Sequence, residues 1–143
     1  MNWQEIRKIH RWLPELSGGW HEHKNGGGWV QDTAHADEAA YISALVSGDA
    51  QVYGNARVSG DARVYGNADI ISIHPIGSRK STLTICRNSE GNLLAFTGCF
   101  SGTLAEFADR VKITHGDSVH GQQYKAAIIF AKAFFKPIPR SET

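Results

Sequence analysis

The stretch that decides the fold is Val46-Ser47-Gly48-Asp49-Ala50-Gln51, followed by Val52-Tyr53-Gly54-Asn55-Ala56-Arg57, Val58-Ser59-Gly60-Asp61-Ala62-Arg63 and Val64-Tyr65-Gly66-Asn67-Ala68-Asp69. Each unit reads Val-x-Gly-(Asp/Asn)-Ala-x, and Ile70 opens a fifth unit. A repeat of six residues does not match an α-helix, which repeats about every 3.6 residues. Glycine followed by Asp or Asn also recurs too often to leave strands of ordinary length for a flat hairpin stack. The repeat therefore predicts a coil with short straight sides, in which valine packs inward and the Gly-Asp/Asn pair turns the chain.

These units resemble the hexapeptide repeat of left-handed parallel β-helices, in which a small residue follows an aliphatic one four positions later. The resemblance implies three hexads per coil, so the strict run supplies little more than one turn. The six-residue spacing continues less strictly before the repeats. Ala34 and Ala40 are in phase with Val46, and Ala44 is in phase with Ala50, which predicts a first coil that begins near Trp29.

We therefore expect a mixed β/α fold within a single compact domain. Residues 1–28 are predicted to form an N-terminal helix and a Gly/His-rich loop. Residues 29–74 are predicted to form the short left-handed β-helix-like coil. Residues 75–143 are predicted to form a β-hairpin and two α-helices that bind ligand and mediate oligomerisation.

Composition and charge narrow the classes of function. The chain has 143 residues, is 41% hydrophobic and 20% charged, and carries a formal net charge of +1. This balance gives no bulk signal for long nucleic acid or an anionic membrane, although a small anionic ligand remains compatible with it. No apolar run approaches the length that spans a bilayer, and the N-terminus does not read as a signal peptide. Cys86 and Cys99 form neither a disulfide framework nor a zinc spacing, so we expect a cytosolic protein with free thiols.

The first residues predict a helix and then a loop. Trp3, Ile6 and Leu13 fall on one face of a helix over residues 2–16, which is expected to dock on the protein or on another subunit. The glycine-rich stretch 17–29 contains His21-Glu22-His23, which invites a metal site. Because no further ligands accompany this triplet, we interpret it as a solvated loop and expect no metal. The tryptophans of the stretch are expected to stack on a ring or to cover the open end of the coil.

After the repeats, Pro75 is expected to end the pattern, and a turn follows that carries Arg79 and Lys80. Residues 81–87 and 93–100 alternate as two strands joined by a turn over 88–92. Thr103 and Glu106 form a capping box that opens a helix. A last helix is predicted from about residue 119 or 122 to 135, and it is apolar around so much of its circumference that it suggests subunit association.

Two interpretations of the outward repeat positions remain open. Tyr53 shares a phase with Tyr65, and Arg57 shares another with Arg63. Such positions are usually a solvated face with side-chain ladders. The alternative is a basic and aromatic strip that contacts a partner subunit or a ligand.

Catalysis is disfavoured by the sequence. Cys99 with His115 or His120 and Asp117 contains the elements of a nucleophile set, but no nucleophile elbow is present and Cys99 lies in an apolar strand. Acyl transfer on a hexapeptide coil needs more coils than this chain supplies. Binding without turnover fits better. Arg79 is the candidate for a phosphate, and Ser101 and Thr103 lie at a helix start that attracts anions. Phe100 and Tyr124 are candidates for stacking on a base, and His115 and His120 for hydrogen bonds to a sugar or base. Thr103 is also needed as a helix cap, and His115 as a helix end.

The motifs of the second half carry a family resemblance. They are Ile76-Gly77-Ser78-Arg79, Thr97-Gly98-Cys99-Phe100-x-Gly102-Thr103-Leu104-x-Glu106-Phe107, Thr114-His115-Gly116-Asp117 and His120-Gly121-x-x-Tyr124. With the hexads, they resemble a group of small tailed-phage and prophage proteins over about residues 29–135. The chain is similar to the viral sponge proteins that sequester the cyclic-nucleotide signals of bacterial CBASS defence.

The resemblance implies a homo-oligomer, with a tetramer as the expected size, that binds a cyclic di- or oligonucleotide without cleaving it. It implies no catalytic residue, cofactor or metal, and it places the protein in the cytoplasm of an infected bacterial host. Two alternatives stay open at this point: an enzyme that acts on a nucleotide or acyl substrate, and a phage structural or protein-interaction module.

Overall fold

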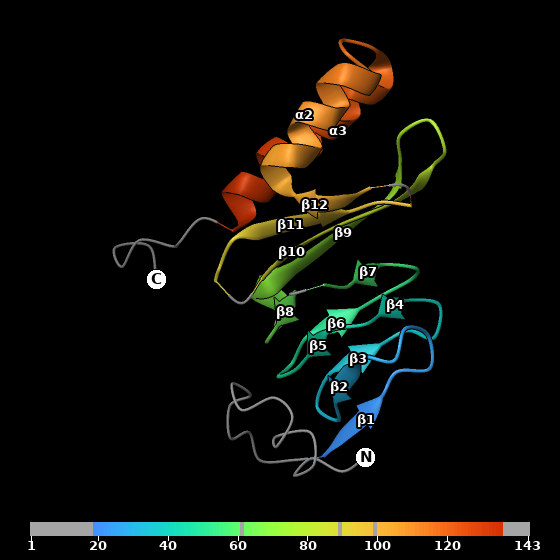
Figure 1. Cartoon of the computed structure of the whole chain (residues 1–143), viewed down its shortest axis with the longest axis vertical. Helices are drawn as coiled ribbons and strands as arrows, with labels where there is room; N and C mark the ends of the chain where they lie inside the picture. The colour runs from blue at the N-terminus through green and yellow to red at the C-terminus, as the bar shows by residue number, and fades with distance from the viewer. Residues whose placement is uncertain (1–18, 61, 89, 99, 136–143) are drawn as a thin grey trace.

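The computed structural model describes residues 19–60, 62–88, 90–98 and 100–135. Three tiers follow one another along the long axis of the molecule (Figure 1). Small parallel sheets form one end, a four-stranded antiparallel sheet lies in the middle, and two helices form the other end.

The first tier is built from very short strands that stack in parallel. They are β1 (Trp20–Glu22), β2 (Trp29–Gln31), β3 (His35–Ala36), β4 (Tyr41–Ile42), β5 (Leu45–Val46), β6 (Gln51–Val52), β7 (Arg57–Val58) and β8 (Arg63–Val64). β2, β5 and β8 pair in parallel on one side, β3 with β6 on a second, and β4 with β7 on a third. β1 pairs antiparallel with β2, so residues 20–22 form a hairpin strand where the sequence analysis predicted a loop.

The predicted fold class is wrong. The described residues form a mixed structure of several small sheets and two C-terminal helices, without a clear left-handed β-helix. The parallel pairing includes three strands on one side and two on each of the others, and after β8 the chain continues into the antiparallel sheet. The predicted N-terminal helix falls on residues 2–16, which lie outside the described residues.

The repeat still organises the local packing of this tier. Val46, Val52, Val58 and Val64 are all completely buried in a core that they share with Ala50, Ala56 and Ala62. The corner glycines Gly48, Gly54 and Gly60 have φ of 65°, 62° and 64°, in the left-handed region that favours glycine. The fourth glycine, Gly66, instead has φ of −175° and precedes the short 3-10 helix η1 (Asn67–Asp69). The fourth sequence unit therefore does not adopt the glycine corner of the first three.

The middle tier is an antiparallel sheet in the order β12-β11-β10-β9. Its strands are β9 (Ile70–Ile76), β10 (Ser81–Arg87), β11 (Leu93–Phe96) and β12 (Ser101–Thr103). The predicted hairpin is confirmed by the pairing of β10 with β11, although the returning strand ends at Phe96 instead of Phe100. The sequence analysis did not predict β9 or β12. Pro75 is tolerated inside β9 because that strand lies at the edge of the sheet.

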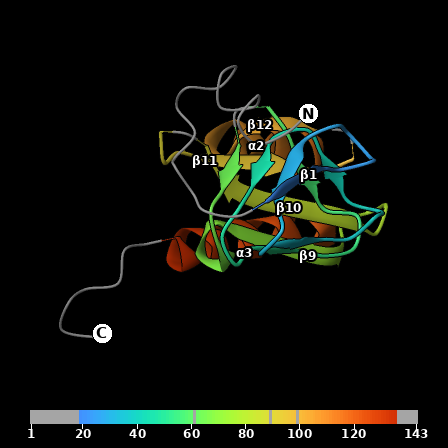
Figure 2. The same cartoon turned by 90° about the horizontal axis from the view of Figure 1, so that it is seen from below.

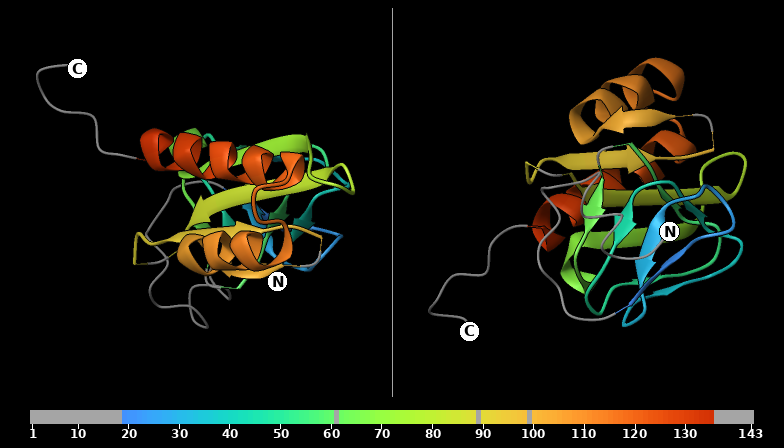
Figure 3. Two further views of the ribbon diagram at one scale, coloured as in Figure 1. Left: turned by 90° about the horizontal axis from the view of Figure 1, so that it is seen from above. Right: turned by 60° about the horizontal axis from the view of Figure 1, so that its bottom comes forward.

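Both faces of this sheet are covered, as the views along the long axis show (Figures 2 and 3). Along β10, Leu83 and Ile85 join the core beneath the helices, whereas Cys86 joins the core of the parallel strands. Phe96 and Ala95 of β11 divide between the two cores in the same way. The alternation of side chains along each strand thus connects the first tier to the third.

The third tier consists of α2 (Leu104–Thr114) and α3 (Val119–Phe134). The predicted capping box is confirmed, because Thr103 and Glu106 exchange both of its hydrogen bonds. α2 buries Leu104, Phe107 and Val111. The buried residues of α3 are Gly121, Tyr124, Ala127, Ile128 and Ala131.

Hydroxyl groups of β10 close the upper end of the parallel stack. The backbone N–H of Arg57, in β7, donates to Oγ1 of Thr84 at 3.0 Å. The Thr82 hydroxyl donates to Oδ1 of Asn55 at a corner of the same turn. Thr84 is 1% exposed, so water does not replace its oxygen readily. The sheet therefore supplies both apolar cover and polar partners to the end of the stack.

We expect Thr84→Val to lower the free energy of unfolding by about 1 kcal/mol, because the partly buried Arg57 N–H then loses its acceptor. Thr33→Val is the matched control, since the exposed Thr33 hydroxyl donates to the Gly48 carbonyl where water can replace it. That control should change stability by no more than about 0.5 kcal/mol. Urea unfolding measures both variants, and equal losses would show that Thr84 does not act as a buried acceptor.

Candidate functional site

Three of the predicted site residues meet where the two helices join. His115 ends α2, and His120 and Tyr124 lie in the first turns of α3. The ring centroids of His115 and His120 are 6.3 Å apart, and those of His115 and Tyr124 are 5.5 Å apart. We call the residues of this region, His115, His120 and Tyr124 with the facing 77–80 turn, the helical tip.

The turn between β9 and β10 packs directly against this cluster. The Gly77 N–H donates to Oε1 of Gln123 at 3.0 Å. A Cβ atom at Gly77 would lie 2.0 Å from the Tyr124 hydroxyl oxygen, and the Gly77 φ is 78°, so glycine is required there for two separate reasons. Arg79 and Lys80 follow in the same turn and are exposed. Arg79 is therefore held on the side of the protein where the helical tip lies.

Phe100 joins the helical tip only indirectly. Its ring lies 5.4 Å from that of Phe107, and Phe107 lies 5.4 Å from Tyr124 in an edge-to-face contact. The Arg110 guanidinium covers Phe100 from the outside, 5.6 Å from the ring centroid. Phe100 thus supports the ring cluster by packing, and Tyr124 does the same, since it is only 8% exposed.

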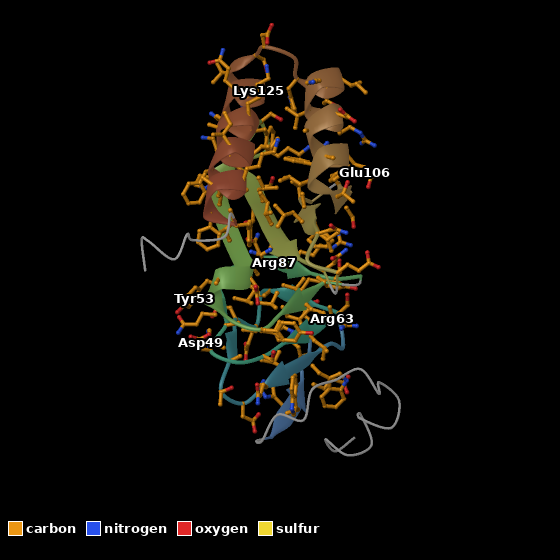
Figure 4. All side chains as sticks on the ribbon, turned by 90° about the vertical axis from the view of Figure 1, so that its left-hand side faces the viewer. Asp49, Tyr53, Arg63, Arg87, Glu106 and Lys125 are labelled. Carbon is orange, nitrogen blue, oxygen red and sulfur yellow. The ribbon has the colours of Figure 1, made fainter. Side chains whose placement is uncertain are left out.

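Ser101 and Thr103 lie at the other end of α2. The helix has 11 residues, which makes it about 16 Å long, so a small ligand does not reach both ends. Figure 4 shows the same separation, with Glu106 low on one helix and Lys125 near the tip of the other. The structure therefore brings His115, His120 and Tyr124 together, with the turn that carries Arg79 packed against Tyr124 through Gly77. Ser101 and Thr103 lie outside this region, at the other end of α2.

The start of α2 is already occupied by an anion from the chain itself. The Thr103 N–H donates to Oε1 of Glu106 at 3.1 Å, and the Glu106 N–H donates to Oγ1 of Thr103 at 3.1 Å. The backbone hydrogen bond from Thr103, followed by its side-chain bond, holds the pKa of Glu106 below the ordinary value of 4.5. The amide that the sequence analysis assigned to a phosphate thus has a carboxylate partner.

The helical tip is rich in groups that can donate hydrogen bonds. Lys125 forms an ion pair of 3.0 Å with Asp117, and Lys112 lies in the last turn of α2. Nδ1 of His120 is buried and has no hydrogen-bond partner among the residues that the structure describes. In the tautomer that carries its proton on Nδ1, a ligand oxygen would satisfy this nitrogen.

The His21-Glu22-His23 triplet is divided between different partners. Nδ1 of His21 lies 2.8 Å from Oδ1 of Asp32. The His23 ring is buried, with its nitrogens 3.0 Å and 2.9 Å from the carbonyl oxygens of Asn25 and Asp37. Within the described ranges, no three His, Cys, Asp or Glu side chains gather closely enough to hold a metal ion. Cys99 lies outside those ranges, so the geometry of the alternative nucleophile set stays untested.

Two hollows lie outside the helical tip, and Thr103 is the one predicted site residue among the residues that line them. One, of about 430 Å³, is lined by Asn88, Asn92, Leu93, Thr103, Leu104, Ala105, Ala108 and Lys132. The other, of about 150 Å³, lies between the parallel strands and the antiparallel sheet and includes Tyr41, Arg57 and Phe96. The sequence analysis placed Arg57 only on a possible basic strip, because no local pattern connects it with residues so far along the chain.

No family model, curated protein or solved structure matches the chain. None of the helices in the described part of the chain is long and apolar enough to cross a membrane.

The carboxylate at the start of α2 predicts a pH dependence of stability. A lowered pKa in the folded state means that ionised Glu106 stabilises the fold above its unfolded pKa, and that this contribution disappears as the pH falls through the folded pKa. We expect Glu106→Gln to be less stable than wild type at neutral pH, with a difference that shrinks as the pH falls below 4.5.

Thermal unfolding between neutral and acidic pH measures this difference. Thr103→Ala is the comparison, because it removes the capping hydroxyl and should cost about 1 kcal/mol. Parallel stability curves for wild type and Glu106→Gln would contradict the prediction.

Proposed function

We propose that the protein is a non-catalytic binder that sequesters a cyclic di- or oligonucleotide in the cytoplasm of an infected bacterial host, and so blocks a CBASS-type defence. The observation that supports this most directly is the helical tip. There, two imidazoles and the arginine-bearing turn come together from three separate elements.

The chemistry of the helical tip suits a nucleotide with several phosphates and bases. An arginine such as Arg79 binds phosphate oxygens through two parallel hydrogen bonds. His115 and His120 are half-buried, so their rings offer both a flat face and polar nitrogens. Tight capture needs no reaction, because a preorganised site keeps the ordering cost of binding low.

The proposal assigns different roles to the seven predicted residues. Arg79, His115 and His120 contact the ligand. Tyr124 and Phe100 hold the histidines and the turn in place by packing. Ser101 and Thr103 take no part in this site, because they lie at the other end of α2.

Calorimetric titration with a panel of 3′,3′-cyclic dinucleotides tests the proposal. We expect saturable binding of at least one member, and recovery of the intact nucleotide by chromatography after heat denaturation of the complex. Arg79→Ala and His120→Ala should each weaken binding about tenfold or more, as expected for loss of a charge-assisted or buried hydrogen bond.

Lys24→Ala is the control for these variants, because it removes one positive charge from an exposed turn between β1 and β2 at the opposite end of the molecule. Linear products would identify a nuclease instead. A complete lack of binding across the panel would favour a structural or protein-interaction module.

We also propose that α3 mediates homo-oligomerisation through its outer face. Ile129, Phe130 and Phe134 are 69%, 54% and 40% exposed, and together they form an apolar stripe. A second copy fits this stripe, because antiparallel packing about a two-fold axis at Phe130 places the large Phe134 of each helix opposite the small Ala126 of the other. The two helical tips then point away from the contact.

Phe130→Glu should convert the oligomer into monomers, because it places a charge at the centre of the contact. Ile113→Glu is the matched control, since Ile113 is 83% exposed on α2, outside the stripe. Light scattering after gel filtration measures the mass of each. A wild-type monomer at micromolar concentration, or an unchanged mass for Phe130→Glu, would overturn this contact.

A further inference from the structure

The hollow between the parallel strands and the sheet has the properties of a separate anion site. Its volume is about 150 Å³, and it is lined by Tyr41, Asn55, Arg57, Ser81, Thr82, Phe96, Thr97 and Gly98. Drug-sized ligands occupy pockets of about 300–1,000 Å³, so this hollow suits a single small group. Its arginine comes from β7, on the opposite side of the sheet from the helices.

Arg57 is held by aromatic rings. Its guanidinium carbon lies 5.4 Å from the ring centroid of Tyr41 and 5.9 Å from that of Phe96. Its backbone is fixed by the hydrogen bond to Thr84. Stacking on rings engages the faces of a guanidinium and leaves its N–H groups, which lie in the plane, for hydrogen bonds.

One N–H group of the Arg57 side chain differs from the backbone N–H, which is paired with Thr84. Its Nε is buried and has no hydrogen-bond partner among them. A buried N–H without an acceptor is unfavourable, and native proteins rarely keep one. This side of the guanidinium therefore lacks an acceptor among the described residues.

Arg87 shows what a purely structural arginine looks like in this protein. It too lies against a ring, 5.1 Å from the centroid of Phe135. Its Nε, however, is 3.2 Å from Oδ1 of Asp69, and its Nη2 donates to the Phe135 carbonyl oxygen at 3.0 Å. Arg57 has the same kind of aromatic support without these acceptors.

The other lining groups favour an oxyanion. Ser81 contributes a hydroxyl, and the lining contains no Asp or Glu that would repel a negative charge. Tyr41 is 39% exposed, so its ring is accessible to solvent at this hollow. We propose that this hollow binds a phosphate group through the Arg57 guanidinium, independently of the nucleotide site at the helical tip.

A phosphate group can reach this hollow from two sources, which an experiment can separate. One is inorganic phosphate, and the other is the phosphate of a nucleoside monophosphate, whose base would stack on Tyr41. The probes are therefore inorganic phosphate and 5′-AMP, each titrated into the full-length wild-type protein at constant ionic strength against chloride.

The readout is the arginine Nε–H signals in a ¹H–¹⁵N correlation spectrum. We expect the Arg57 signal, assigned from triple-resonance spectra of the wild-type protein, to shift and saturate at millimolar probe. The Arg87 signal is the internal control and should not move, because its Nε is already paired with Asp69. Tighter binding of 5′-AMP than of phosphate, lost in Tyr41→Leu, would identify the nucleoside monophosphate as the source.

Three results would overturn the proposal. They are an Arg57 signal that does not saturate with either probe, equal shifts at Arg57 and Arg87, and a loss of cyclic dinucleotide affinity in Arg57→Lys that matches the loss in Arg79→Ala. The last result would merge the hollow with the helical tip. The titration of the wild-type protein stands even if a variant fails to fold, so a failure here is distinguishable from failure of the proposed function.

Discussion

The open end of the parallel stack imposes the constraint on which the remaining structure depends. A stack of short strands that stops presents unpaired backbone groups and an uncovered apolar interior, both of which are unfavourable in water and invite association. Here the antiparallel sheet lies across that end. Cys86, Leu94 and Phe96 complete the apolar core, and the Thr84 hydroxyl accepts the Arg57 N–H. One face of the antiparallel sheet thus covers the end of the parallel stack.

Because one face of the sheet covers the parallel stack, the helices must cover the other face, and this fixes the position of the helical tip. The second face of the sheet carries Leu83 and Ile85, which are completely buried beneath α2 and α3. The helices cover this face and their connection lies at the far end of the molecule from the parallel strands (Figure 1). The 77–80 turn contacts the first turns of α3 through Gly77. The residues of the helical tip are therefore brought together by the need to cover the sheet, although they come from separate parts of the sequence.

Local patterns in the sequence predicted the local structure well. The hexads correctly predicted buried valines, and the Thr103–Glu106 spacing predicted the start of α2. The same patterns failed where distant partners decide the outcome. Gly66 occupies the same repeat position as Gly60 but adopts φ of −175° instead of 64°, because the chain turns there toward β9 and the antiparallel sheet. The fold class was wrong for this reason.

The candidate site divides in the same way. His115, His120 and Tyr124 are close in sequence, and their grouping follows from the short connection between two predicted helices. Thr103 belongs to the same motif, but the length of α2 carries it away from the others. The contact of Arg57 with Tyr41 and Phe96 joins three distant strands, and a single sequence contains no signal for it.

Among the described residues, two buried side-chain nitrogens lack the kind of partner that other polar groups of the fold have. Where a donor serves the fold, the chain supplies the acceptor itself: Glu106 accepts the Thr103 amide, and Asp69 accepts from Arg87. Nε of Arg57 and Nδ1 of His120 are buried without such partners among the described residues. Each is nevertheless fixed by aromatic contacts, so its position does not depend on an acceptor. Rigid support combined with unused hydrogen-bonding capacity is what a preorganised binding site requires, and it is costly for a group that serves stability alone.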